Sequence, residues 1–190
     1  RDGSGTTYIY KEKEYSLSLC GEYQIENSLT AIEAVSASGF NIPYETVKKA
    51  LGATFFPARA EIISRNPLTV LDGAHNPDGA EALAEIMKKY GWRITAVIGV
   101  MRDKDYETVL KKTLPYCRAA VAVTVENMPR SLAGEKLAAA ASKYCPCITA
   151  ENYGAAIEKS RSSAGGDPVF VFGSLYLASG IREKLKIFYN

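Results

Sequence analysis

Residues 68–78 read Leu68-Thr-Val-Leu-Asp72-Gly-Ala-His75-Asn76-Pro77-Asp78, and they hold the clearest structural pattern in the chain. Their apolar beginning is typical of a buried strand, which ends at Asp72 and runs into a glycine-containing turn. Asn76 can cap a helix whose first turn holds a proline and an acidic residue. The pattern therefore predicts a strand, a short loop and a helix over residues 77–90. The loop carries His75, the single histidine of the chain.

Beyond residue 57 the pattern alternates between strand and helix, which favours an α/β fold with a mostly parallel, Rossmann-like sheet and helices on both faces. We expect strands near residues 60–64, 68–71, 94–99, 119–125, 147–149 and 168–172. We expect helices near residues 77–90, 104–114, 131–144, 153–162 and 174–187. Only a few residues separate the first two strands, so these two should pair as a hairpin.

The residues before this alternating region form a different pattern. Residues 6–10 and 15–19 are rich in aromatic and apolar side chains and predict two strands, joined by a polar turn over residues 11–14. Helices are expected over residues 23–38 and 43–51. The segment Thr54-Phe-Phe-Pro57 is the expected domain boundary, which divides the chain into residues 1–55 and residues 56–190.

Polar side chains follow three of the predicted strands. One loop carries Asp72 and His75, a second is Arg102-Asp-Lys-Asp105, and a third is Gly173-Ser174. Parallel strands bring such loops together at one sheet edge, where α/β domains bind ligands. Helix N-termini at this edge favour an anion, so the loops suit a ligand with phosphate or carboxylate groups.

Each loop also has a purely structural interpretation. Asn76 by itself is good capping chemistry, and Asp103 and Ser174 could cap the helices that follow them. His75 could simply bond a backbone carbonyl. The ligand-binding interpretation gains because all three loops follow the carboxyl ends of strands, where capping and binding are compatible.

Composition excludes several classes of protein. The chain is 47% hydrophobic and 23% charged, its net charge is +2, and both signs are spread along it, so no nucleic-acid partner is expected. No apolar run approaches the ~18 residues of a membrane span and no signal peptide is visible, so we expect a cytoplasmic protein without a membrane partner. Cys145-Pro-Cys147 could bind a metal or exchange disulfides; the alternative is reduced, partly buried thiols.

Several catalytic motifs are missing from these residues. There is no GxxxxGK[ST] phosphate loop, no GxGxxG, no HExxH and no GxSxG. A single histidine cannot build a histidine-based metal site, so no metal ligands are expected in this chain. The chain therefore offers a ligand-binding face without a complete reaction centre.

Leu71-Asp72-Gly73-Ala74-His75-Asn76-Pro77 resembles the signature of folylpolyglutamate synthases and dihydrofolate synthases, which are ATP-dependent amide ligases of the Mur ligase superfamily. Further segments are similar to the family's G-x-x-x-DKD, PRAL, GSLYL, PGR-x-E and LxGxHQxxN patterns. They are Gly99-Val-Met-Arg-Asp103-Lys104-Asp105, Pro129-Arg130-Ser131-Leu132, Gly173-Ser174-Leu175-Tyr176-Leu177, Phe56-Pro57-Ala58-Arg59-Ala60-Glu61 and Leu19-Cys-Gly21-Glu-Tyr23-Gln24-Ile-Glu-Asn27. The chain departs from the family at Tyr23, where histidine is usual, at Ala58, where glycine is usual, and at Ser179-Gly180, where Gly-Glu is common.

The resemblance implies a division of labour. Residues 56–190 would be the C-terminal ligase domain, and residues 1–55 the incomplete tail of a central ATP-binding domain. The phosphate loop and the ligands of magnesium would lie in that preceding domain. ATP would phosphorylate the carboxylate of a folate, and the amine of incoming L-glutamate would attack the acyl phosphate. Closure of the two domains would exclude water from that intermediate.

Residue roles follow from the same resemblance. Asn27 would contact adenine, and Arg59 would lie near the ATP phosphates. Asp72 would face the nucleotide, His75 would lie near the phosphates or the incoming glutamate, and Ser174 would help to hold the glutamate. Asp72 and His75 are the candidate catalytic residues. The alternatives are a surface ion pair between Arg59 and Glu61, and a solvent-facing position for Asn27.

Three hypotheses about the function stay open. The first is the C-terminal part of a folylpolyglutamate synthase-like ligase, inactive without its ATPase domain and monomeric at full length. The second is another Mur-superfamily amino-acid ligase, and the third is a non-catalytic α/β anion- or nucleotide-binding module. We also expect residues 1–53 to self-associate or to be poorly ordered, because one apolar helix face would lack its covering sheet. That face is formed by Ile25, Leu29, Ile32 and Val35.

Overall fold

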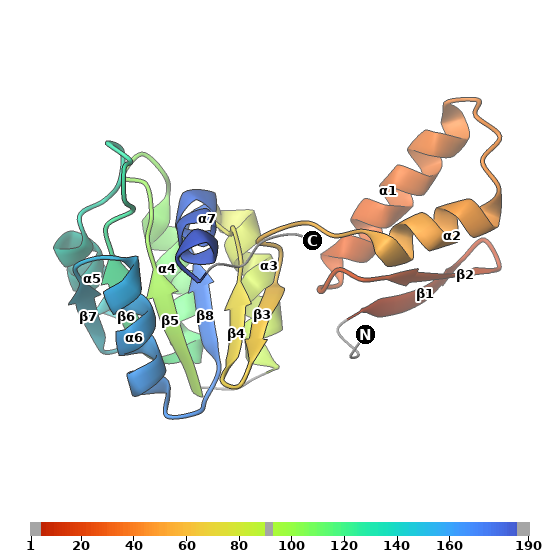
Figure 1. The fold of residues 1–190 in the computed structure, drawn as a ribbon. Helices are drawn as coiled ribbons and strands as arrows, with labels where there is room; N and C mark the ends of the chain where they lie inside the picture. Colours follow the sequence, from red (N-terminus) through yellow and green to blue (C-terminus); the bar gives the residue numbers. More distant parts are fainter. Residues whose placement is uncertain (1–4, 90–92, 186–190) are drawn as a thin grey trace. The chain divides into compact units, whose positions relative to one another are not determined.

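The structure is a computed structural model that describes residues 5–89 and 93–185. It divides into two compact units, with the division between Ala60 and Glu61. We call residues up to Ala60 unit 1 and residues from Glu61 unit 2, and we describe each by itself (Figure 1). The division falls a few residues after the segment Thr54-Phe-Phe-Pro57 that the sequence suggested.

Unit 1 is a β-hairpin with two helices. Its elements are β1 (Thr6–Tyr10), β2 (Lys13–Leu17), α1 (Tyr23–Ala37) and α2 (Tyr44–Ala53). The two strands are antiparallel, and Tyr8 lies opposite Tyr15. The turn is shorter than the expected residues 11–14, because Lys11 and Glu12 alone adopt positive φ (47° and 62°). The β2 strand consequently begins earlier than expected.

Tyrosines organise the packing of unit 1. Tyr15 is buried and stacks on Tyr8 at 5.7 Å, and Tyr44 of α2 meets its ring edge-on at 5.4 Å. The hydroxyls of Tyr8 and Ser28 lie 2.5 Å apart, which joins the hairpin to α1. Offset and edge-on ring pairs are favourable geometries for aromatic side chains.

The apolar face of α1 is better covered than the sequence indicated. Ile32 is buried, and the other three residues of that face are half-buried, because α1 packs against the hairpin. The expectation that this face would be exposed is therefore wrong. Large exposed apolar side chains of unit 1 lie elsewhere: Ile9, Phe40, Ile42, Phe55 and Phe56. Self-association through residues 1–53 stays a prediction.

Unit 2 contains the expected sheet. Its strands are β3 (Glu61–Arg65), β4 (Leu68–Leu71), β5 (Ile94–Ile98), β6 (Cys117–Val123), β7 (Cys147–Ala150) and β8 (Val169–Phe172). The spatial order is β3-β4-β8-β5-β6-β7. The β3 and β4 strands form the expected antiparallel hairpin, and every other neighbouring pair is parallel.

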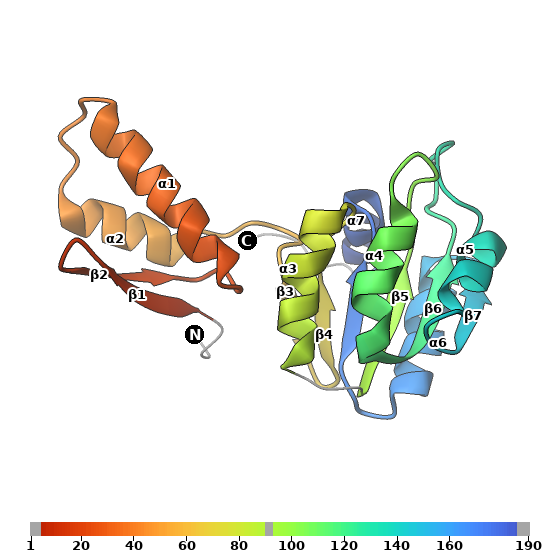
Figure 2. The same ribbon diagram turned by 180° about the vertical axis from the view of Figure 1, so that it is seen from behind.

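Helices cover both faces of this sheet, as the sequence predicted (Figures 1 and 2). One face carries α3 (Pro77–Lys88), α4 (Tyr106–Thr113) and α5 (Gly134–Ala141). The other carries α6 (Tyr153–Ala164) and α7 (Leu175–Lys184). The α5 helix begins later than expected because the preceding residues bond elsewhere: Leu132 N–H donates to Val100 O. The expected ends of the helices at residue 90 and at residues 186–187 lie outside the described residues.

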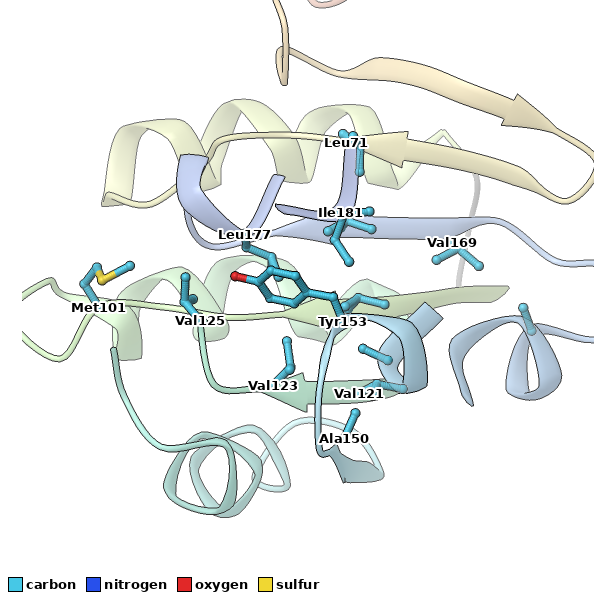
Figure 3. Packing of buried hydrophobic residues seen from close by; sticks show 14 residues of the cluster. Leu71, Met101, Val121, Val123, Val125, Ala150, Tyr153, Val169, Leu177 and Ile181 are labelled. Carbon is cyan, nitrogen blue, oxygen red and sulfur yellow. The ribbon is translucent and has the colours of Figure 1, made fainter. Parts of the chain in front are cut away.

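The core on the α6–α7 face includes Val97, Val121, Val171 and Ile181, all buried among apolar neighbours (Figure 3). Tyr153 lies in this cluster with its ring against α7. A Cβ atom on Gly180 would come within 2.1 Å of the Tyr153 ring, so only glycine permits this approach. The close contact explains why α7 has a glycine within its helical interior, where glycine is normally unfavourable.

A buried ion pair joins the first strand of unit 2 to its last described helix. Arg182 of α7 donates to the carboxylate of Glu61 at the start of β3, and the two side chains are only 9% and 10% exposed. Removing one partner of a buried pair leaves the other charge uncompensated in a medium that solvates it poorly.

We therefore expect Arg182→Met to lower the free energy of unfolding by about 3 kcal/mol. The double variant Glu61→Leu/Arg182→Met should recover most of that loss, because it leaves no buried charge. Urea unfolding followed by circular dichroism measures both. Arg161→Met, at an exposed position of α6, is the control and should unfold like the original chain. Equal losses in the single and double variants would contradict this account.

Candidate functional site

Three loops meet at the carboxyl edge of the unit 2 sheet. The β8 strand lies between β4 and β5 and is parallel to both, so the loops that follow these strands are neighbours, as expected. Backbone hydrogen bonds join them: Gly173 N–H donates to Ala74 O at 2.9 Å, and Gly99 N–H donates to Phe172 O at 3.3 Å.

Gly173 allows these loops to come so close. Its φ is +109°, a conformation that residues with a side chain rarely adopt. A Cβ atom there would lie 2.8 Å from Gly99 O, well inside van der Waals contact. The close approach of the loops after β8 and β5 therefore requires a residue without a side chain at position 173.

Asp72 is less open than the sequence suggested. It is 4% exposed, and its Oδ1 accepts a hydrogen bond from Ala74 N–H at 2.7 Å. The carboxylate therefore fixes the turn that carries Ala74 and His75. A buried carboxylate that bonds its own loop acts first as a positioning group.

His75 is half-buried, and its Nδ1 lies 2.9 Å from Gly73 O. A carbonyl can only accept, so Nδ1 carries the proton and the neutral ring has its lone pair on Nε2. Among the described residues, Nε2 has no hydrogen-bond partner. Asn76 caps α3, as expected, by accepting from Gly79 N–H at 2.8 Å. Capping and an available imidazole nitrogen thus coexist in one loop.

The second loop differs from its expected capping pattern. Asp105, rather than Asp103, caps α4 by accepting from Thr108 N–H at 3.1 Å. Asp103 instead pairs with Arg130 at 2.7 Å. Partial burial raises the pKa of the Asp103 carboxyl, but its own backbone N–H and the Arg130 charge outweigh this and lower it. Asp103 therefore stays ionised and holds a guanidinium beside the loop.

This ion pair also joins two segments that are separate in sequence. Arg102 N–H donates to Arg130 O at 2.9 Å, and Met101 bridges to Ser131. The sequence did not predict this union, although both segments follow strands that turned out to be neighbours in the sheet. The complementary charges of Asp103 and Arg130 were the available signal.

Ser174 is buried, and its Oγ accepts from Tyr176 N–H at 3.0 Å, so it caps α7. The capping interpretation is therefore confirmed. A role for this residue toward glutamate stays a prediction.

Of the candidate residues of unit 1, Asn27 is exposed and Arg59 is half-buried. Asn27 is exposed on α1, and its side-chain N–H donates to Gln24 Oε1 at 3.0 Å. The Arg59 guanidinium lies over the Phe56 ring, 5.7 Å from its centroid. Glu61, the alternative partner for Arg59, pairs with Arg182. Ala58 adopts φ +52°, at the position where the resemblance has glycine.

Cys117, Cys145 and Cys147 have raised pKa values rather than the lowered ones of reactive thiols. Burial raises the pKa of Cys145 to about 11 and that of Cys147 to about 12, and it raises the pKa of Cys117 as well. Within the described ranges, no three His, Cys, Asp or Glu side chains are placed to hold a metal ion. The geometry favours reduced, unreactive thiols over a metal or disulfide-exchange site.

The described helices were also compared with the length and composition of a membrane span. Across residues 5–89 and 93–185, none combines the length and apolar composition needed to cross a bilayer.

Comparison with known proteins shows that the chain is similar to part of several ligases. A family model described as the Mur ligase, glutamate ligase domain, matches residues 58–175. The chain is 31% identical to the folylpolyglutamate synthase of Lacticaseibacillus casei, over 96% of this chain and 44% of that protein. It is 32% identical to the dihydrofolate synthase/folylpolyglutamate synthase of Bacillus subtilis, over 97% of this chain and 45% of that protein.

A solved structure shares the fold. Mycobacterium tuberculosis folylpolyglutamate synthase, crystallised with ADP and AMPPCP, superposes with a TM-score of 0.86 and 26% identity. That match covers 100% of this chain and 49% of the other. The chain therefore spans about half the length of the relatives that it matches.

The cysteine pKa values predict slow alkylation. At pH 8 a thiol of pKa about 11 is roughly one part in a thousand thiolate, and the thiolate is the reacting form. Cys145 and Cys147 should therefore react with iodoacetamide at least ~100-fold more slowly than glutathione. Their rates should rise about tenfold per pH unit up to pH 10, measured by mass spectrometry of the peptides. A rate that levels off near pH 8.5 would contradict the raised pKa values.

Proposed function

Because the chain belongs to the Mur ligase family, through that family's glutamate ligase domain, we propose that it is the C-terminal part of an ATP-dependent ligase that adds L-glutamate to a folate. The observation that carries the proposal is the loop after β4. It carries His75 at the sheet edge where neighbouring loops converge, with Nδ1 bonded to Gly73 O and no hydrogen-bond partner for Nε2 among the described residues. The curated relatives that match nearly the whole chain are named as folylpolyglutamate synthases, which supports this substrate class.

The reaction requires a group that accepts a proton. When the amine of glutamate attacks an acyl phosphate, a C–N bond forms, the C–O bond to phosphate breaks, and the amine nitrogen loses a proton. His75 has the free lone pair that can accept a hydrogen bond from that amine. Asp72 fixes the turn that carries His75, and is therefore a positioning residue in this proposal.

Other roles follow from the remaining loops. Ser174 sets the start of α7 beside the same edge and would orient the glutamate through this helix end. Arg59 presents a planar cation suited to phosphate oxygens, and Asn27 an exposed amide suited to adenine. Asp72 would reach the nucleotide only through the loop that it shapes.

Magnesium and the phosphate loop would come from residues outside this chain. The described residues bring no three potential metal ligands together. In this proposal Arg59, Asn27 and His75 supply contacts to ATP and no metal ligands. We therefore propose that the 190-residue chain is inactive by itself, and that ATP supplies the activated phosphate when the whole enzyme closes.

A second Mur-superfamily activity, with another acceptor in place of folate, is the main competitor. The segment around Asp103, which is similar to the DKD pattern of folylpolyglutamate synthases, favours the folate acceptor. A non-catalytic binding module would need His75 for affinity only.

The upstream gene sequence separates these proposals from a stand-alone module. Reading the genomic frame that precedes Arg1 should reveal a GxxxxGK[ST] phosphate loop. A start codon immediately before Arg1 would instead support a non-catalytic module.

In the full-length enzyme, His75→Ala should lower kcat/KM for L-glutamate about 100-fold, because a general acid–base group contributes at least that much. Glutamate-dependent release of phosphate from ATP, with a folate acceptor, is the measurement. Asp78→Asn, at an exposed position in the first turn of α3, is the matched control and should keep the original kinetics.

Asp72 provides a second comparison. Asp72→Asn retains an oxygen that can accept from Ala74 N–H, so it should lose much less activity than Asp72→Ala. If His75→Ala and Asp72→Ala both keep the original kinetics, the site assignment is wrong. Turnover with a cell-wall precursor but not with folate would favour the competing ligase.

A further inference from the structure

Unit 2 contains a cavity of about 660 Å³ that the three loops described above do not line. Its walls come from the segment after β6, from the start of α6 and from one side of α7. The lining residues are Glu126, Asn127, Met128, Tyr153, Tyr176, Ser179, Gly180, Glu183 and Lys184. The volume lies within the range of sites that bind small molecules.

The walls of this cavity are held by specific contacts. Glu126 N–H donates to the Tyr153 hydroxyl at 2.9 Å, and Tyr153 N–H donates to Glu126 Oε1, also at 2.9 Å. These reciprocal bonds fix the segment after β6 on the start of α6. Gly180 lets α7 approach the Tyr153 ring, which lies beside Leu177 (Figure 3). The cavity is therefore bounded by packed elements.

The charges of the cavity favour a cation. The lining includes two carboxylates, those of Glu126 and Glu183, and one ammonium, that of Lys184. Glu126 Oε1 accepts from Tyr153 N–H, and the side chains of Glu183 and Lys184 have no hydrogen bond or ion pair among the described residues. Lys184 runs along the first turn of α6, with its Cε 3.1 Å from where a Gly154 Cβ would be. The remaining carboxylate oxygens are thus available to a ligand.

The shape of the cavity favours a flat or extended cation over a metal ion. Tyr176 is 51% exposed, and Met128 is half-buried, so the lining includes an open aromatic face and a polarisable side chain. A guanidinium group can stack on a tyrosine ring while its N–H groups bond a carboxylate in the same plane. Two carboxylates without a third ligand are a poor metal site, and no metal-binding group was found in the described residues.

We propose that this cavity binds a small organic cation of the guanidinium class, with Glu183 and Glu126 pairing with its charge and Tyr176 stacking on its plane. The site is separate from the glutamate and nucleotide positions proposed above, and its occupation needs neither substrate. It touches the proposed ligase site at one point, because Tyr176 N–H donates to Ser174 Oγ at the start of α7.

Agmatine is a suitable probe, and the 190-residue chain is the protein to titrate. Isothermal titration calorimetry gives its Kd without ATP, folate or glutamate. Glu183→Gln should weaken binding about tenfold, the effect of losing a hydrogen bond to a charged group. Tyr176→Ala should weaken it by about threefold through loss of the ring face. Glu158→Gln, at an exposed α6 position that does not line the cavity, should leave the Kd unchanged.

Methyl NMR of the methionines locates the bound probe. The chain has three methionines, of which Met128 lines the cavity and Met87 and Met101 are buried elsewhere. Agmatine should shift the Met128 methyl signal and leave the other two in place, whereas n-butylamine should shift it less at equal concentration.

Two outcomes would overturn the proposal. One is equal weakening by Glu183→Gln and Glu158→Gln, which would indicate general charge attraction. The other is tighter binding of L-glutamate than of agmatine at Met128. Because neither measurement involves turnover, failure here and failure of the ligase activity remain distinguishable.

Discussion

The insertion of β8 between β4 and β5 is the constraint on which the candidate site depends. Residues separated by about a hundred positions in sequence end side by side because three strands run parallel with that order. Parallel strands end at the same edge of the sheet, so the polar groups in the loops that follow them lie close together. Gly173 permits the closest approach of two of these loops, because Gly99 O lies where a side chain at position 173 would be.

Within this frame, the groups at the edge divide into those that shape loops and those that face outward. The Asp72 carboxylate and the Ser174 hydroxyl are buried and bonded to backbone N–H groups. The imidazole of His75 bonds the backbone through Nδ1, and its Nε2 has no hydrogen-bond partner among the described residues. A rigid inner layer of bonded oxygens thus supports a small number of outward-facing groups, as preorganised sites require.

Much of this fold could be predicted from the sequence because its signals are local. The six unit 2 strands and the five helices follow apolar periodicity and capping residues, and Asn76 with Pro77 marked the start of α3 correctly. The roles of Asp103 and Asp105 could not be separated, since either can cap a helix and only the position of Arg130 decides. The burial of Asp72 and the cover over Ile32 depend on long-range packing, which periodicity does not report.

The contact between Tyr153 and Gly180 limits which residues these two positions can hold together. Any side chain at position 180 would overlap the tyrosine ring. A tyrosine at 153 and a side chain at 180 are therefore mutually exclusive in this backbone. Grafting a helix with a larger residue at position 180 onto this chain would fail unless position 153 were changed in the same step.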